Sequence, residues 1–140
     1  MILFCDTSAL IKLYVREEGT DTVTALATAS DIVALCRIAW VEVMSAMARR
    51  AREQPEDTQA IDEARRRFAA DWPHYLTMEV TQELVELAGD YADTFALRAY
   101  DGVQLAATQL AHREMPGELK FACFDVRLAK AARVLGIEAA

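Results

Sequence analysis

The sequence predicts a single α/β domain built around a mainly parallel β-sheet. Short apolar runs alternate with longer stretches in which apolar residues recur every three or four positions, as strands alternate with amphipathic helices. Strands separated by one or two helices require crossover connections, which produce a parallel sheet with helices on both faces. The chain of 140 residues has the size of one domain, and no repeat, low-complexity tract or linker divides it.

The first half of the chain opens on a buried strand over residues 1–4. This strand runs directly towards Asp6, an efficient helix cap, after which Leu10, Leu13 and Tyr14 indicate a helix. The further elements predicted here are a turn at residues 17–20, a helix over 21–30, a strand over 32–35, and an unusually apolar helix over 38–53 that ends before Pro55.

The second half continues the alternation, and proline and glycine bound several of its elements because proline breaks helices and glycine ends them. The predicted elements are a polar helix over 56–72, a short strand over 74–78, a helix from the Thr81 cap to about Asp93, an apolar helix from about Tyr100 or Asp101 to Arg113, a turn at Pro116–Gly117, a strand over 119–124, a helix over 126–135, and an edge strand from Ile137.

Composition and charge exclude several classes of protein. A hydrophobic content of 54% with 26% charged residues is typical of a folded domain. No apolar run has the length of a membrane span and the first residues lack the pattern of a signal peptide, so we expect a cytoplasmic protein without membrane contact. The net charge of −7 argues against a protein that coats nucleic acid, although it does not exclude a nuclease.

The cysteines and histidines bear on the metal chemistry that is open to this chain. Cys5, Cys36 and Cys123 lie far apart in or beside apolar runs, which indicates buried free thiols in a reducing compartment. With two histidines and no ligand spacing, a zinc site is not expected. Oxygen ligands are therefore the remaining metal chemistry.

Two aspartates follow apolar strands directly and precede helices. Asp6 follows the first strand, and Asp125 repeats this arrangement after the strand that ends at Phe124. Because the carboxyl ends of parallel strands meet at one edge of a sheet, both carboxylates are expected there, where open α/β sheets bind ligands. Each aspartate could equally serve only as a helix cap.

Two further acids lie in or at the start of apolar helices. The neighbours of Glu42 at three and four residues are all uncharged, so this carboxylate has no partner one turn away and needs hydrogen bonds, pairing or a metal. Asp101 precedes Gly102 at the head of another apolar helix, where a cap is the alternative role and glycine permits close approach.

Four carboxylates at one site favour divalent-metal chemistry, because neighbouring carboxylates cannot all ionise near pH 7 without pKa shifts or bound cations. One or two Mg²⁺ or Mn²⁺ ions would relieve the repulsion and could act on a phosphodiester. Thr7 and Ser8, beside Asp6, could orient a carboxylate or water, or could bond only to the local backbone.

Four segments of this chain resemble the PIN-domain family, and most closely its VapC-type toxins from toxin–antitoxin pairs. The resemblance covers the chain from end to end through the order and spacing of the segments, each of which is short. They are residues 4–10 (FCDTSAL), residues 38–43 (IAWVEV) with Ala48-Arg49, residues 97–106 (LRAYDGVQLA), and residues 124–128 (FDVRL) running to Ala131-Ala132 and Gly136.

The resemblance implies a three-layer α/β/α fold with a central sheet of four or five strands and a pocket that binds Mg²⁺ or Mn²⁺. It also implies endoribonuclease activity on an RNA substrate, a homodimer, and inhibition by a cognate antitoxin protein whose tail crosses the pocket. The catalytic and metal-binding acids of the family correspond to Asp6, Glu42, Asp101 and Asp125 here, and the hydroxyl beside the first aspartate corresponds to Ser8 or Thr7.

This chain departs from the family pattern at two cysteines. Many relatives carry serine or threonine where this chain has Cys36 and Cys123, which puts any hydroxyl-dependent role there in doubt. Arg49, on the face of Glu42, and Arg98, three residues before Asp101, are candidates for phosphate contacts. Either could instead be a surface arginine or contact the antitoxin.

Two other functions remain as alternatives. A PIN-like module that has lost turnover, and serves only to bind metal or protein, would be expected to lack one of the acids, and none is missing. An aspartate-based phosphatase fits less well, because such enzymes place a second aspartate two residues after the first, where this chain has Ser8.

Overall fold

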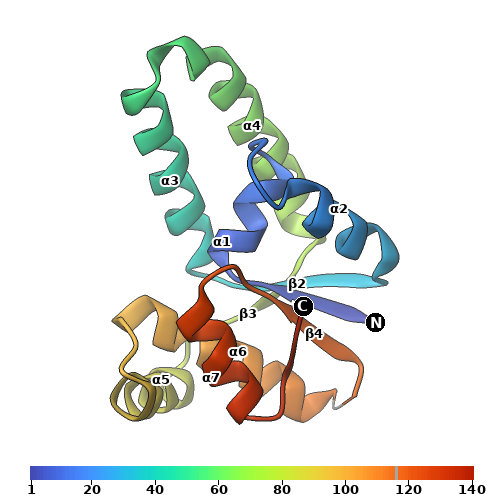
Figure 1. The fold of residues 1–140 in the computed structure, drawn as a ribbon, viewed down its shortest axis with the longest axis vertical. Coiled ribbons are helices and arrows are strands. Elements are labelled where there is room, and N and C mark those ends of the chain that lie inside the picture. Colours follow the sequence, from blue (N-terminus) through green and yellow to red (C-terminus); the bar gives the residue numbers. More distant parts are fainter. Residues whose placement is uncertain (116) are drawn as a thin grey trace.

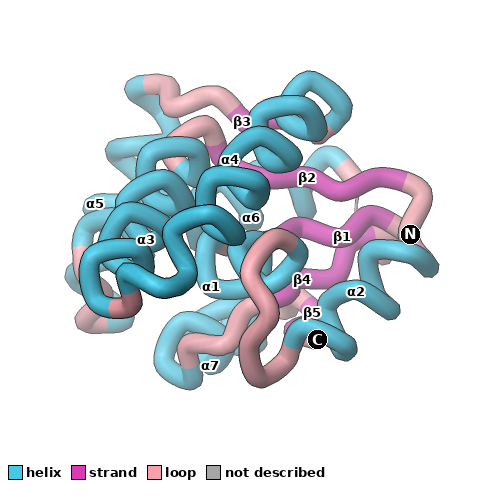
Figure 2. The backbone as a smooth tube through the Cα atoms, turned by 90° about the horizontal axis from the view of Figure 1, so that it is seen from above, coloured by secondary structure: helices cyan, strands magenta, loops and turns pink. Residues whose placement is uncertain are grey.

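A computed structural model describes residues 1–115 and 117–140. In this part of the chain, five strands form one fully parallel sheet between two layers of helices (Figure 1). The strand order is β3-β2-β1-β4-β5, which Figure 2 shows from above. The strands are β1 (Ile2–Cys5), β2 (Ile32–Cys36), β3 (Leu76–Met78), β4 (Leu119–Ala122) and β5 (Glu138–Ala139). The predicted parallel α/β/α architecture is confirmed.

The helices divide between the two faces of the sheet. In Figure 1, α1 to α4 lie on one face and α5 to α7 on the other, and α3 and α4 project from the sheet as a helical hairpin. None of the helices in the described ranges is both long and apolar enough to cross a bilayer. The helices are α1 (Thr7–Leu10), α2 (Thr20–Ala29), α3 (Ala39–Glu53), α4 (Thr58–Asp71), α5 (Gln82–Phe95), α6 (Ala99–Glu114) and α7 (Val126–Val134).

The ends of several elements differ from the prediction. The first helix contains one turn and continues as a 3-10 helix over Ile11–Leu13, and α4 is preceded by a 3-10 turn over Pro55–Asp57. The strand predicted over 119–124 ends at Ala122, because the next residues turn towards the start of α7. The turn predicted at Pro116 lies outside the described residues, while Gly117 beside it adopts a φ of +85° that favours glycine.

Strand β1 separates two hydrophobic cores. Ile2 and Phe4 belong to the core shared with α5, α6 and α7, whereas Leu3 and Cys5 belong to the core shared with α1 to α4. All four side chains are buried, which explains why the first strand is apolar at every position rather than at alternate ones.

The chain leaves the centre of the sheet in two directions. From β1 it passes through α1 and α2 to β2 on one side, while from β4 it passes through α7 to β5 on the other. Strands β1 and β4 are neighbours, so their carboxyl ends flank the point where the strand order reverses. Such a point opens a crevice between the following loops and is where open α/β sheets bind ligands.

Candidate active site

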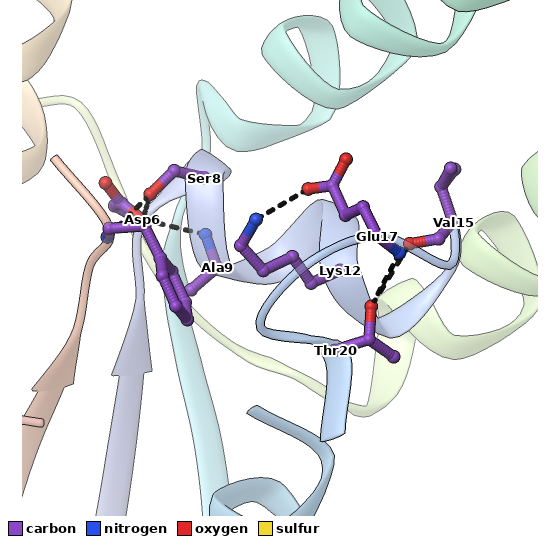
Figure 3. A network of polar contacts seen from close by, with 8 residues as sticks. Asp6, Ser8, Ala9, Lys12, Val15, Glu17 and Thr20 are labelled. Carbon is purple, nitrogen blue, oxygen red and sulfur yellow. Dashed lines mark hydrogen bonds and ion pairs between the residues drawn. The ribbon is translucent and has the colours of Figure 1, made fainter. Parts of the chain in front are cut away.

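Asp6 lies at the carboxyl end of β1 and caps α1. Its Oδ1 accepts hydrogen bonds from the main-chain N–H of Ala9 at 3.0 Å and from Ser8 Oγ at 2.7 Å (Figure 3). The residue is only 4% exposed. Asp6 therefore caps α1 through the Ala9 N–H. Because the Ser8 hydroxyl donates to the same oxygen, neither of these hydrogen bonds engages Oδ2 of the carboxylate.

Ser8 also joins the loops that follow the two central strands. Its Oγ accepts a hydrogen bond of 3.0 Å from the main-chain N–H of Phe124, the residue before Asp125. In addition, the Asp6 N–H donates to the carbonyl of Ala122 at 3.2 Å. These bonds fix the start of α7 beside the start of α1, and with it the position of Asp125.

Asp125 repeats the local geometry of Asp6. It is the N-cap of α7, and its Oδ1 accepts a hydrogen bond of 3.0 Å from the main-chain N–H of Leu128. Unlike Asp6, it is exposed at the mouth of the crevice.

Glu42 lies in the first turn of α3 and is half-buried. Its Oε1 accepts hydrogen bonds from Thr7 Oγ1 and from Gln104 Nε2, each at 2.8 Å. Gln104 Nε2 also lies 3.2 Å from Thr7 Oγ1, so α1, α3 and α6 meet at this carboxylate. Thr7 and Ser8 thus each donate to a carboxylate, and the reading in which they bond only to the local backbone is wrong.

Asp101 occupies the first turn of α6, following Arg98 at its N-cap. Burial raises the pKa of Asp101, and the negative charges of Asp125 and Glu42 raise it further. The guanidinium of Arg98 acts in the opposite direction. The pKa of Asp101 therefore depends on two acids across the crevice, Glu42 on α3 and Asp125 at the start of α7.

One cavity of about 580 Å³ receives all of these side chains. We call it the acidic cavity. Every candidate site residue predicted from the sequence lines it: Asp6, Thr7, Ser8, Glu42, Arg49, Arg98, Asp101 and Asp125.

The buried carboxylate of Asp6 is electrostatically strained. Burial, and to a lesser extent the charge of Glu42, raise the pKa of Asp6 to about 6 from its ordinary value of 3.8, although the Ser8 and Ala9 hydrogen bonds oppose the shift. Near neutral pH the anionic form is thus held at a cost that a bound cation would relieve.

The two cysteines at hydroxyl positions of the family lie in the core. Cys123 is buried, with its Sγ 3.5 Å from the main-chain oxygen of Asp125. Burial raises the pKa of its thiol, and the charge of Asp6 raises it further. Cys36 is buried in β2, where burial likewise raises the pKa of its thiol. Both therefore remain neutral thiols.

The donor chemistry of the cavity fits a hard divalent cation. Among the described residues, no three acidic, histidine or cysteine side chains stand close enough together to hold one ion. Mg²⁺, however, commonly binds through one or two carboxylates and keeps several waters. Gln104 lines the cavity, and its buried Oε1 has no hydrogen-bond partner in the described part of the chain. This oxygen is therefore a further acceptor that a donor or a cation in the cavity would satisfy.

Seven residues that line the cavity were not anticipated from the sequence: Ile11, Val15, Glu17, Ala46, Arg50, Glu53 and Gln104. Gln104 is buried and donates a hydrogen bond to Glu42. The sequence contains a signal for this role, because Gln104 is a polar residue three positions after Asp101, on the same side of an apolar helix. Glu17 is a further acid on the wall, paired with Lys12 at 2.7 Å (Figure 3). The Lys12 ammonium also lies 4.6 Å from the centre of the Phe124 ring.

An open parallel sheet with acids at its switch point defines the class of this protein, and comparison with known families agrees. The model of the PIN domain matches residues 3–134, so the chain belongs to the PIN-domain family. Ribonuclease VapC45 of Mycobacterium tuberculosis (strain CDC 1551 / Oshkosh) is 32% identical over 139 residues, which cover 99% of this chain and 94% of the relative.

Solved structures share the fold. The chain is similar to FitAcB from Neisseria gonorrhoeae, with a TM-score of 0.65, 18% identity, and coverage of 99% of this chain and 96% of the other. It is also similar to a toxin–antitoxin complex from Klebsiella pneumoniae, with a TM-score of 0.61, 23% identity, and coverage of 88% and 85%.

Proposed function

We propose that this protein is an Mg²⁺- or Mn²⁺-dependent endoribonuclease and the toxin of a toxin–antitoxin pair. The observation that carries the proposal is the convergence of Asp6, Glu42, Asp101 and Asp125, from four separate segments, on one cavity that is also lined by Arg49, Arg50 and Arg98. Support for RNA as the substrate comes from the relative named as a ribonuclease, which is similar over nearly the full chain.

The residues have distinct roles in this proposal. One or two of the four carboxylates would bind each of one or two ions, with Asp6 fixed by Ser8 and Ala9, and Glu42 fixed by Thr7 and Gln104. When bound, such an ion supplies Lewis-acid chemistry at a phosphoryl oxygen. Arg49 and Arg98 would contact phosphates of the RNA, since guanidinium groups match the geometry of phosphate oxygens.

The proposal extends to the partners of the protein. The structural similarity to a toxin–antitoxin complex supports a cognate antitoxin protein, which would cover the acidic cavity. We further propose a homodimer, as the family resemblance implies. A cytoplasmic location is in keeping with Cys5, Cys36 and Cys123, which are free and buried.

Cleavage of a mixed RNA pool tests the activity. The purified protein is incubated with the pool in Mg²⁺, in Mn²⁺ and in EDTA, beside the variants Asp6→Asn and Asp101→Asn. We expect cleavage with either ion, and a loss of at least about 100-fold in EDTA or in either variant, because removal of a metal ligand disables the ion. Asp90→Asn, an exposed aspartate of α5 outside the cavity, should cleave like the wild type.

Each contrary result has a definite meaning. Cleavage that persists in EDTA, or in both variants, contradicts the metal-dependent mechanism. Absence of cleavage under every condition favours the module that binds metal or protein without turnover. Thermal unfolding with and without Mg²⁺ separates these cases, since an ion that binds only the folded chain raises the melting temperature.

A further inference from the structure

A second hollow of about 340 Å³ adjoins the acidic cavity between α3 and the start of α6. It shares part of its wall with the acidic cavity, including Glu42 and Arg49, and adds Val41, Ser45 and Tyr100. We call it the side hollow. Because the two spaces share lining residues, a molecule in the acidic cavity can extend into the side hollow without leaving the surface.

The wall of the side hollow carries fewer charged groups than the acidic cavity, since Val41, Ala46 and Tyr100 line it beside Glu42, Arg49 and two hydroxyl residues. Tyr100 is 56% exposed and Val41 is 55% exposed, and among the large apolar side chains of the described residues only Val126 and Val134 are more exposed. The aromatic contacts of the described residues form a cluster around Phe68 and two separate pairs, and none of them includes Tyr100. No packing contact of this kind therefore explains an exposed aromatic ring at this position.

Arg49 marks the junction of the two spaces. Its neighbour Arg50 is paired with Asp57 at 3.2 Å, whereas Arg49 is exposed and makes no ion pair with any described residue. An arginine that lines both hollows and forms no ion pair in the described part of the chain provides positive charge beside the side chains of Val41 and Tyr100. This combination is complementary to a nucleotide, which carries a phosphate at one end and a flat base at the other.

We propose that the side hollow binds a nucleobase of the RNA substrate, next to the phosphodiester that lies in the acidic cavity. The base lies against Tyr100 and Val41, and its phosphate lies at Arg49. This inference rests on the proposed ribonuclease function. Stacking on an aromatic ring tolerates every base, because each base presents a flat π-face, so the subsite adds affinity before it adds sequence preference.

Binding of single nucleotides tests the subsite without any need for cleavage. The probes are the four nucleoside 5′-monophosphates and ribose 5-phosphate, each added with Mg²⁺ to protein with isotope-labelled valine methyl groups. We expect the nucleotides to shift the NMR signals of Val41. Ribose 5-phosphate, which lacks a base, should leave these signals nearly unchanged. The signals of Val134, exposed on α7 outside both hollows, are the internal control.

Variants of Tyr100 identify the stacking ring. Tyr100→Ala should weaken nucleotide binding roughly tenfold, within the range found when aromatic stacking partners are replaced by alanine, and Tyr100→Phe should restore it. Equal shifts from ribose 5-phosphate and the nucleotides, or no shift from any of them, would overturn the subsite. Equal shifts would indicate that the hollow binds only the phosphate. No shift would indicate that it binds an apolar side chain of a protein partner instead.

Cleavage kinetics give the second readout. Tyr100→Ala should raise KM for a short RNA roughly tenfold and leave kcat nearly unchanged, because the lost contact is made equally by the bound substrate and the transition state. Val41→Ser should raise KM by a smaller factor, and Val134→Ser should behave like the wild type. An unchanged KM in Tyr100→Ala would contradict the subsite. Absence of cleavage by the wild type would instead contradict the proposed function, and the nucleotide titration would then test the subsite by itself.

Discussion

Gln104 is an uncharged residue that positions a carboxylate. It is 2% exposed, and its Nε2 donates to Glu42 Oε1 and lies close to Thr7 Oγ1. Replacement by leucine keeps a similar volume but leaves Glu42 with Thr7 as its remaining donor. If Glu42 binds the metal as proposed, we expect Gln104→Leu to fold and to lose about 10- to 100-fold in RNA cleavage, the usual cost of removing a residue that orients a metal ligand.

The measurement is the rate of RNA cleavage over a range of Mg²⁺ concentrations. Gln82→Leu, an exposed glutamine in the first turn of α5, is the matched control and should cleave like the wild type. A Gln104→Leu variant as active as the wild type at every Mg²⁺ concentration would show that Glu42 does not depend on this amide.

Asp6 gives the metal-free protein a pH dependence. The pKa of Asp6 is about 6 in the folded chain and has an ordinary value of 3.8, mainly because of burial. Between these values the folded state binds more protons than the unfolded state, so this residue makes the fold less stable as pH rises from about 4 to about 6. At 1.36 kcal/mol per pKa unit, the loss is on the order of 3 kcal/mol above this window.

Asp6→Asn tests this dependence, because the amide cannot ionise and can still cap α1. In EDTA, the variant should be more stable than the wild type by about 2–3 kcal/mol at about pH 7, and the difference should vanish near pH 4. Urea unfolding across this pH range measures it, with Asp90→Asn as the control. A difference that stays constant with pH would mean that Asp6 does not titrate in this window.

The side chains of the site differ in how far the sequence could anticipate them. Asp6 and Asp125 follow apolar strands, and Glu42 lacks a partner within its own helix, so each carries a local signal. The donors to Glu42 come from α1 and α6, 35 and 62 positions away along the chain, and no local pattern specifies such a meeting. Gln104 was therefore missed as a site residue although it lies within a segment that was recognised.

At the scale of the elements, the close packing of α5 and α6 depends on one glycine. A Cβ atom built on Gly102 would lie 2.8 Å from the main-chain oxygen of Ala88, closer than such atoms approach in proteins. The clash involves the backbone of α5 and cannot be relieved by rotation of a side chain. Since Gly102 follows Asp101, a shift of α6 would also move that carboxylate.

Paired substitutions of two helical glycines test this contact. Gly102→Ala should destabilise the protein by about 1–3 kcal/mol, as overpacking does, in spite of the higher helix propensity of alanine. Gly89→Ala in α5 meets no atom within 4 Å and should stabilise the fold by up to about 1 kcal/mol. Urea unfolding measures both, and an equal gain in the two variants would show that α5 and α6 do not pack this closely.

The elements were predictable in order and kind, but their ends were not. The apolar run over 119–124 continues past the end of β4 at Ala122, because Phe124 turns to donate its N–H to Ser8. Ser8 belongs to the first loop of the chain, so the end of β4 is decided by a residue more than a hundred positions away. Hydrophobic periodicity reports on the core and carries no information about such a bond.

At the scale of the whole molecule, the proposed function requires an acidic protein to bind RNA, which is itself an acidic polymer. The net charge of −7 provides no long-range attraction for RNA, and Arg49 and Arg98 are the proposed phosphate contacts. With two contacts and a slope of about −0.7 for each in single-stranded nucleic acid, affinity should fall only roughly sevenfold between about 50 and 200 mM salt.

Fluorescence anisotropy with a labelled short RNA and the Asp101→Asn variant, at constant Mg²⁺, measures the salt dependence without cleavage. In that background, Arg49→Gln should reduce the slope by about 0.7, whereas Arg133→Gln on α7, outside the cavity, should leave it unchanged. A fall in affinity of about 100-fold or more over this range would reveal a much larger basic surface than these two residues.

The pairing of β1 with β4 determines when the site can exist during folding. These neighbouring strands are separated along the chain by nearly all the other elements, and contacts between distant segments close slowly because of the entropy of the loop. A nascent chain made only as far as α6 already contains Asp6, Glu42 and Asp101, but it lacks β4, the loop that Ser8 holds, and Asp125. The crevice between the two loops therefore cannot assemble on such a chain, and a ribosome partway through synthesis carries no completed acidic cavity.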